Sequence, residues 1–210
     1  MNKIKDAIKF IGTEIINQKD FLTELDQAIG DGDHGINMAR GFNTVFKKLD
    51  TIDDNSDASV ILKTVGMGLL SSVGGASGPL YGTAFLRASM LLKNQYSIDL
   101  PLAIELINAA IKGIQDRGKA VQGEKTMLDV FIPVKESLIN SQKANDDILT
   151  ALQKAVDVAH ENVEHTKNII ATKGRASYLE ERSLGHQDPG ATSSSIMLES
   201  LYKYLKENKE

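Results

Sequence analysis

The chain has 210 residues, of which 41% are hydrophobic and 25% are charged, a balance typical of a globular protein with a sizeable core. Its net charge of −4 argues against nucleic acid and anionic membranes as partners, and the absence of cysteine excludes disulfides, zinc–thiolate sites and thiol catalysis. Residues 1–21 carry charges throughout and are not expected to be a signal peptide, and no run approaches the ~20 apolar residues of a membrane span. We therefore expect a cytoplasmic protein that forms one domain over residues 1–210.

Apolar residues recur every three or four positions along most of the chain, which is the period of an amphipathic α-helix. The clearest stripes lie in residues 4–15, 60–69, 104–114, 127–138, 152–163 and 196–205. We count about eight helical segments, and the alternation that marks a strand is missing. Because only 5% of the residues are aromatic, the core must be mostly aliphatic, which favours helices packed on helices. The sequence therefore predicts an all-α fold.

Three sites that contain proline indicate where helices begin. Asp99 precedes Pro101, and Asp188 precedes Pro189, so each site pairs an N-capping carboxylate with a proline in the first helical turn. We interpret Ser77-Gly78-Pro79 as a third start of the same kind, with serine as the cap.

A short acidic segment, DQAIGDGDHGINMAR (residues 26–40), is the strongest functional signal. It places Asp26, Asp31 and Asp33 within eight residues, and like charges this close repel unless a cation or water screens them. A hard divalent ion bound by carboxylate oxygens would resolve this repulsion, and His34 beside them is a candidate for ligand contact. From these residues alone, a solvated acidic turn between helices remains the alternative.

Two familiar nucleotide-binding patterns are excluded by their context. GDGDHG matches the glycine spacing of a dinucleotide-binding loop, but no strand precedes it and bare carboxylates would face the pyrophosphate. GIQDRGKA (residues 113–120) is close to a P-loop, but no serine or threonine follows Lys119 and the preceding segment is helical. Gly118 is more simply interpreted as the residue that ends a helix.

Two further segments suit an anionic ligand. In SSVGGASGPLYGT (residues 71–83) a glycine-rich turn leads directly into a helix, whose free N–H groups bind phosphate well. In residues 173–195, cationic side chains such as Arg175 precede an Asp-Pro-Gly-Ala-Thr helix start. The alternatives are an ordinary helix-to-helix turn and a solvated loop with a good N-cap.

Taken together, four blocks resemble the nucleotide-binding L subunit of bacterial dihydroxyacetone kinases. They are LDQAIGDGDHGINMARGF, SSVGGASGPLYGT, RGKAVQGEKTMLDV and KGRASYLEERSLGHQDPGATS, they occur in the order of the family, and the similarity covers nearly the whole chain. The resemblance implies an antiparallel barrel of eight helices with the nucleotide at one end, which agrees with the helix count.

The resemblance also implies roles for individual residues. Asp26, Asp31 and Asp33 would hold two Mg²⁺ ions that bridge to the phosphates of ADP or ATP, and no catalytic residue is expected beyond these metal ligands. Ala76 and Ser77 would hold the phosphates. The remaining nucleotide contacts would come from His34, Gly35, Ile36, Asn37, Gly118, Met127, Arg175, Asp188, Pro189 and Gly190.

By the same resemblance, the chain is expected to be a phosphotransferase subunit. Its length, without a substrate domain, favours the version that depends on the sugar phosphotransferase system, in which a phosphohistidine-carrying M subunit converts bound ADP to ATP. The phosphoryl group then passes to dihydroxyacetone on a separate K subunit. The alternatives are the nucleotide-binding half of an ATP-dependent kinase, a regulatory module that reports its nucleotide state, and a metal-dependent phosphohydrolase. The oligomeric state is left open, a homodimer included.

Overall fold

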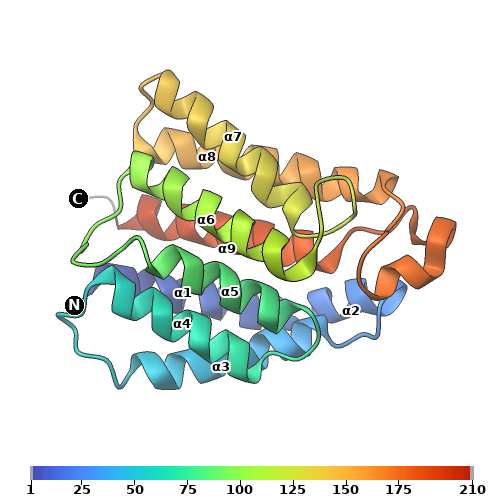
Figure 1. Ribbon diagram of the computed structural model, residues 1–210, viewed down its shortest axis with the longest axis horizontal. Helices are drawn as coiled ribbons and strands as arrows, with labels where there is room; N and C mark the ends of the chain where they lie inside the picture. Colours follow the sequence, from blue (N-terminus) through green and yellow to red (C-terminus); the bar gives the residue numbers. More distant parts are fainter. Residues whose placement is uncertain (1, 209–210) are drawn as a thin grey trace.

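The computed structural model describes residues 2–208, so Met1, Lys209 and Glu210 of the expected domain lie outside the described residues. Over that range the chain forms nine α-helices and two 3-10 helices without a strand, which confirms the all-α prediction (Figure 1). The α-helices are α1 (Lys3–Asn17), α2 (Lys19–Ile29), α3 (His34–Leu49), α4 (Ala58–Ser72), α5 (Ser77–Ser89), α6 (Leu100–Gly118), α7 (Leu128–Lys143), α8 (Ile148–His165) and α9 (Pro189–Glu207). The 3-10 helices are η1 (Thr166–Asn168) and η2 (Arg175–Ser183).

The helices close into an antiparallel barrel. Because only Gln18 separates α1 from α2, these two helices form one interrupted rod, and the nine α-helices of residues 2–208 make eight rods. Helix α1 packs on α3, each later helix packs on the next one in the chain, and α9 packs back on α1. The start of α1 and the end of α9 lie at one end of the barrel (Figure 1). The connections at residues 30–33, 73–76, 119–127 and 166–188 lie at the other end, which brings the functional segments of the sequence together.

The helix starts follow local capping chemistry at two of the three expected sites. The Asp99 carboxylate accepts the N–H of Leu102 at 2.9 Å, and the Asp188 carboxylate accepts the N–H of Ala191 at 2.7 Å, as expected for N-caps. The third prediction is wrong by one residue. Helix α5 already begins at Ser77, which makes no capping bond, because its hydroxyl contacts a histidine across the barrel end instead.

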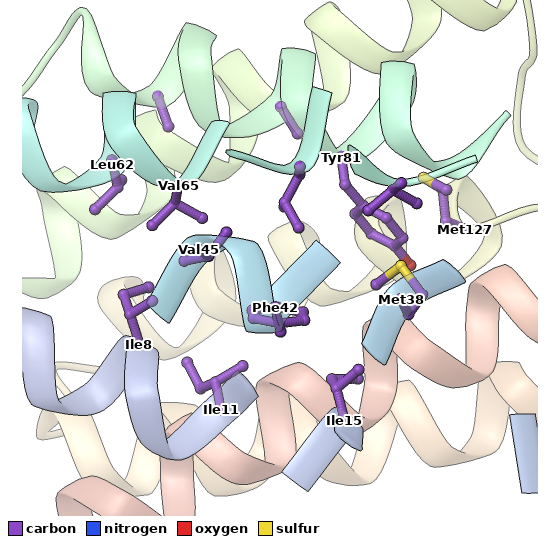
Figure 2. Packing of buried hydrophobic residues seen from close by; sticks show 14 of the residues in the cluster. Ile8, Ile11, Ile15, Met38, Phe42, Val45, Leu62, Val65, Tyr81 and Met127 are labelled. Atoms are coloured by element: carbon purple, nitrogen blue, oxygen red, sulfur yellow. The ribbon is translucent and has the colours of Figure 1, made fainter. Parts of the chain in front are cut away.

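Aliphatic side chains fill the barrel, as the composition predicts. Figure 2 shows Ile11 and Ile15 of α1 pointing toward Phe42 of α3, with Val65 of α4 on the far side. Ile15, Phe42 and Val65 have no exposed surface. Burial of this kind stabilises a fold by ~25 cal/mol per Å² of apolar surface, so the barrel is a firm frame for the loops at its end. No helix among the described residues is long and apolar enough to cross a bilayer.

Candidate functional site

The acidic turn is the centre of the site. Asp26 lies in the last turn of α2, while Asp31 and Asp33 lie in the short turn that leads into α3. One carboxylate oxygen from each of the three residues lies within 4.8 Å of the others. Asp26 also shapes the turn, since its carboxylate accepts the backbone N–H of Asp33 at 2.8 Å and of His34 at 3.1 Å. These three oxygens converge at a partly exposed position. They fit a hard divalent ion whose remaining ligands come from solvent or substrate.

The glycine-rich turn faces this cluster. Gly75 has φ +64°, a left-handed conformation that favours glycine, and the chain then enters α5 without a side-chain cap. Uncapped N–H groups in a first helical turn attract anions. Gly74 approaches Asn37 of α3 so closely that an added Cβ would lie 2.9 Å from the amide oxygen. The turn therefore holds a helix N-terminus next to the carboxylates.

A third segment completes the site. Residues 172–178, which lead into η2 and include its first turn, lie opposite the first two turns. The Arg175 guanidinium pairs with the Asp31 carboxylate at 3.0 Å. Together the three segments enclose a cavity of about 630 Å³, a size typical of sites for small organic ligands. The cavity therefore combines carboxylates, a helix N-terminus and a cation, which suits a phosphorylated ligand with a divalent ion.

A buried hydrogen-bond chain extends from the cavity into the core. His34 lies between Ser77, 3.0 Å from its Nδ1, and Ser193, 2.9 Å from its Nε2. The Ser193 hydroxyl lies 2.7 Å from the hydroxyl of Tyr81, which donates to the carbonyl of Gly190 at 2.9 Å. Burial lowers the pKa of His34 and so favours the neutral ring, although Asp26 and Asp33 act in the opposite direction. These hydrogen bonds fix the imidazole against Ser77, which lines the cavity.

Comparison with known proteins decides the family. A family model described as the DAK2 domain matches residues 28–203. The chain belongs to the DAK2 domain family. Among its relatives is "PEP-dependent dihydroxyacetone kinase, ADP-binding subunit DhaL" of Escherichia coli (strain K12), 48% identical over 190 residues, which are 90% of each chain. "PTS-dependent dihydroxyacetone kinase, ADP-binding subunit DhaL" of Lactococcus lactis is 43% identical over 208 residues, 98% of this chain and 100% of the relative.

A solved structure shows the same fold. The crystal structure of the dihydroxyacetone kinase of C. freundii is 25% identical, with a TM-score of 0.73. The similarity covers 95% of this chain and 34% of that kinase, so the chain corresponds to about a third of the longer protein. These findings confirm the resemblance inferred from the sequence and the barrel that it implied.

In this member of the DAK2 domain family, the residues expected from the sequence fall into two groups. Those that line the cavity are Asp26, Asp31, Asp33, His34, Asn37, Ala76, Ser77, Arg175 and Pro189. Those that lie outside its lining are Gly35, Ile36, Gly118, Met127, Asp188 and Gly190. Gly35 is packed against the backbone of α2, and the side chain of Ile36 is half exposed on α3. Met127 and Asp188 are buried and do not line the cavity. Contact of any of these residues with a nucleotide stays a prediction.

The structure adds residues that the sequence analysis did not single out. The cavity is also lined by Ile29, Gly30, Gly74, Gly75, Thr172, Lys173, Gly174, Ala176, Ser177 and Tyr178. Most of them are neighbours of predicted residues within the four blocks, so their place in the chain was a usable signal. Thr172 lies just before the fourth block, whereas Tyr178 lies within it and is 81% exposed.

The wall of the DAK2 site contains a strained residue. Glu180, within η2, has φ 52° and ψ −125°, a combination that glycine adopts readily and other residues rarely. We expect Glu180→Gly to raise the free energy of unfolding by about 1 kcal/mol. The melting temperature should rise by about 2–4 °C. Glu181→Gly, at the next exposed residue, is the matched control and should be destabilising. An equal fall in melting temperature for both variants would show that Glu180 is not strained.

Proposed function

We propose that this chain is the ADP- and ATP-binding subunit of a dihydroxyacetone kinase. The observation that carries the proposal is the convergence of Asp26, Asp31 and Asp33 opposite the N-terminus of α5 across one cavity. This arrangement suits a nucleoside diphosphate with magnesium, and relatives that align over 90% or more of their chains with this one are described as ADP-binding subunits. The proposal thus rests on the chemistry of the site and on the names of its relatives.

The residues of the chain would divide the work as follows. The three carboxylates would hold magnesium, two ions in our proposal, and uncapped N–H groups of α5 would receive phosphate oxygens. Arg175 lies where its guanidinium can pair with a phosphate, since it already reaches the Asp31 carboxylate. When bound, Mg²⁺ supplies positive charge to the phosphate oxygens and stabilises the charge that develops during phosphoryl transfer. The chain itself would bind and orient the nucleotide and neutralise the charge of its phosphates. No covalent nucleophile is assigned to it.

Partners follow from the same proposal. A phosphohistidine-carrying M subunit would donate a phosphoryl group to the ADP held here, and a K subunit would present dihydroxyacetone as the final acceptor. The designations "PEP-dependent" and "PTS-dependent" of the relatives support this version over a self-contained ATP-dependent kinase. The chain has no cysteine, which agrees with the reducing cytoplasm that we propose as its location.

Native mass spectrometry of the purified chain, with and without EDTA, tests the proposal. We expect ADP and magnesium to stay on the protein through purification and to be lost together in EDTA, because each neutralises the other in the site. An empty chain that binds Mg·ATP reversibly would favour the ATP-dependent kinase. A chain that binds no nucleotide with magnesium present would contradict both versions.

A further inference from the structure

The segment between α8 and α9, residues 166–188, forms one wall of the cavity but has little apolar anchoring of its own. Within its central stretch, 169–186, Ala171 and Ser183 are the buried residues, while most of the others are exposed or half-buried. Its 3-10 helices are short, and its tip carries Arg175 over the acidic turn. Polar contacts must therefore determine its shape.

The strongest of these contacts come from one lysine in the connection between α6 and α7. The side chain of Lys125 is buried, with 1% of its surface exposed. Its ammonium group donates to the carbonyl of Thr166 at 2.7 Å and of Ile169 at 3.2 Å, at the start of the segment. It also donates to the carbonyl of Ser183 at 2.8 Å and of His186 at 2.5 Å, near the end. A single cation thus joins the two ends of the wall.

The environment of Lys125 resembles that of a bound monovalent cation. Backbone carbonyl oxygens replace its water shell, which is how proteins hold desolvated alkali ions. Burial lowers the pKa of Lys125, and the nearby carboxylates of Asp188 and Asp129 oppose this effect. Lys125 also has φ +60°, a left-handed backbone conformation that glycine adopts more readily than other residues. The ammonium group is thus the point at which carbonyl groups from both ends of the segment converge.

The same connection reaches the cavity through the neighbouring residue. The Glu124 carbonyl accepts the N–H of Thr172 at 3.4 Å, and its carboxylate accepts the Thr172 hydroxyl at 3.0 Å. The Glu124 carboxylate also lies 3.8 Å from the ammonium of Lys173. Thr172 and Lys173 line the cavity just before Arg175. The wall is therefore held at its ends by Lys125 and at its cavity edge by Glu124.

We propose that Lys125 is a positioning residue that serves as a built-in cation for the wall. By holding the carbonyls at both ends of residues 166–188, it sets the loop that presents Arg175 to the acidic turn, without touching the ligand. Its effect on nucleotide binding rests on the proposed function, whereas its effect on the shape of the wall does not. A lysine with only a general role in stability would instead affect all helices alike.

Lys125→Gly in the full chain tests the proposal, because glycine accepts the backbone conformation and removes only the side chain. Lys119→Gly is the matched control, since Lys119 is exposed in the same connection and has φ +52°. We expect Lys125→Gly to speed amide hydrogen exchange in residues 169–186 by about tenfold or more, with α3 to α5 unchanged. Release of ADP in magnesium should be about tenfold faster, as expected for the loss of hydrogen bonds to a charged group. The control should match the natural chain in both measurements.

Chemical rescue gives the sharpest readout. n-Butylammonium has the size and the donors of the deleted side chain, so it should restore protection in residues 169–186, whereas tetramethylammonium, which cannot donate, should not. Faster exchange spread evenly over all helices, or no rescue, would overturn the proposal. If Lys125→Gly does not fold, Lys125→Met keeps the apolar stem, and its failure to fold as well would overturn the proposal. If the natural chain binds no ADP, while Lys125→Gly shows the localised exchange and its rescue, the proposed function would be contradicted and the role of Lys125 supported.

Discussion

Asp31→Asn should abolish retention of nucleotide and magnesium together while leaving the fold intact. The amide keeps the size of the side chain but removes one of three negative oxygens that converge within 4.8 Å. Loss of one charged ligand weakens a carboxylate site for magnesium strongly, so we expect the affinity for Mg·ADP to fall by about 100-fold or more. The phosphates then lose their counter-charge, which is why both ligands should leave together.

Stability should hardly change in this variant. The ion pair between Asp31 and Arg175 is solvent-exposed on both sides, and exposed pairs contribute ~0–1 kcal/mol. Asp116→Asn is the matched control, because it removes the carboxylate of another exposed pair, with Arg87 at 3.7 Å, away from the cavity lining. Isothermal titration with Mg·ADP and thermal unfolding of both variants are the measurements. Normal Mg·ADP affinity in Asp31→Asn would show that the carboxylates do not form the metal site.

The parts of the fold that depend on local sequence were predictable. Helical periodicity and two of the three capping sites follow from residues within a few positions of one another, so the chain alone reveals them. Closure of α9 on α1 joins opposite ends of the chain, and no periodicity encodes it. It was expected only through the resemblance to a known family. The misplaced cap at Ser77 has the same origin, since its hydroxyl partner, His34, lies 43 residues away.

In the site, too, features within a few residues of sequence were predictable, whereas contacts between distant residues were not. The acidic turn is visible in the sequence because its three carboxylates lie within eight residues and their repulsion needs an explanation. The contact of His34 with Ser193 spans 159 residues, and the contact of Lys125 with His186 spans 61. A lysine is mostly exposed in proteins, so its burial here could not be expected from residue type. Such contacts follow from the arrangement of the loops at the barrel end.

The contribution of Asp188 to the stability of the nucleotide-free protein should fall as the pH rises from 5 to 8. Burial raises the pKa of its carboxyl group to about 7, with the Ala191 N–H acting in the opposite direction. The folded chain therefore binds a proton that the unfolded chain, with an aspartate pKa near ~3.9, has already released. This contribution is complete below the unfolded pKa and is lost as the pH passes through the folded pKa. Its loss between pH 5 and 8 amounts to about 3 kcal/mol.

Asp188→Asn should remove this dependence, since the amide oxygen can still accept the N–H of Ala191 but does not titrate. Urea unfolding in EDTA, at several pH values, compares the variant with the natural chain. Relative to that of the natural chain, the free energy of unfolding of the variant should rise by about 3 kcal/mol between pH 5 and 8. Asp99→Asn, at the exposed N-cap of α6, is the matched control and should show no such change. Parallel pH profiles for Asp188→Asn and the natural chain would mean that the buried carboxyl is already ionised in the folded protein, with Lys125 as its counter-charge.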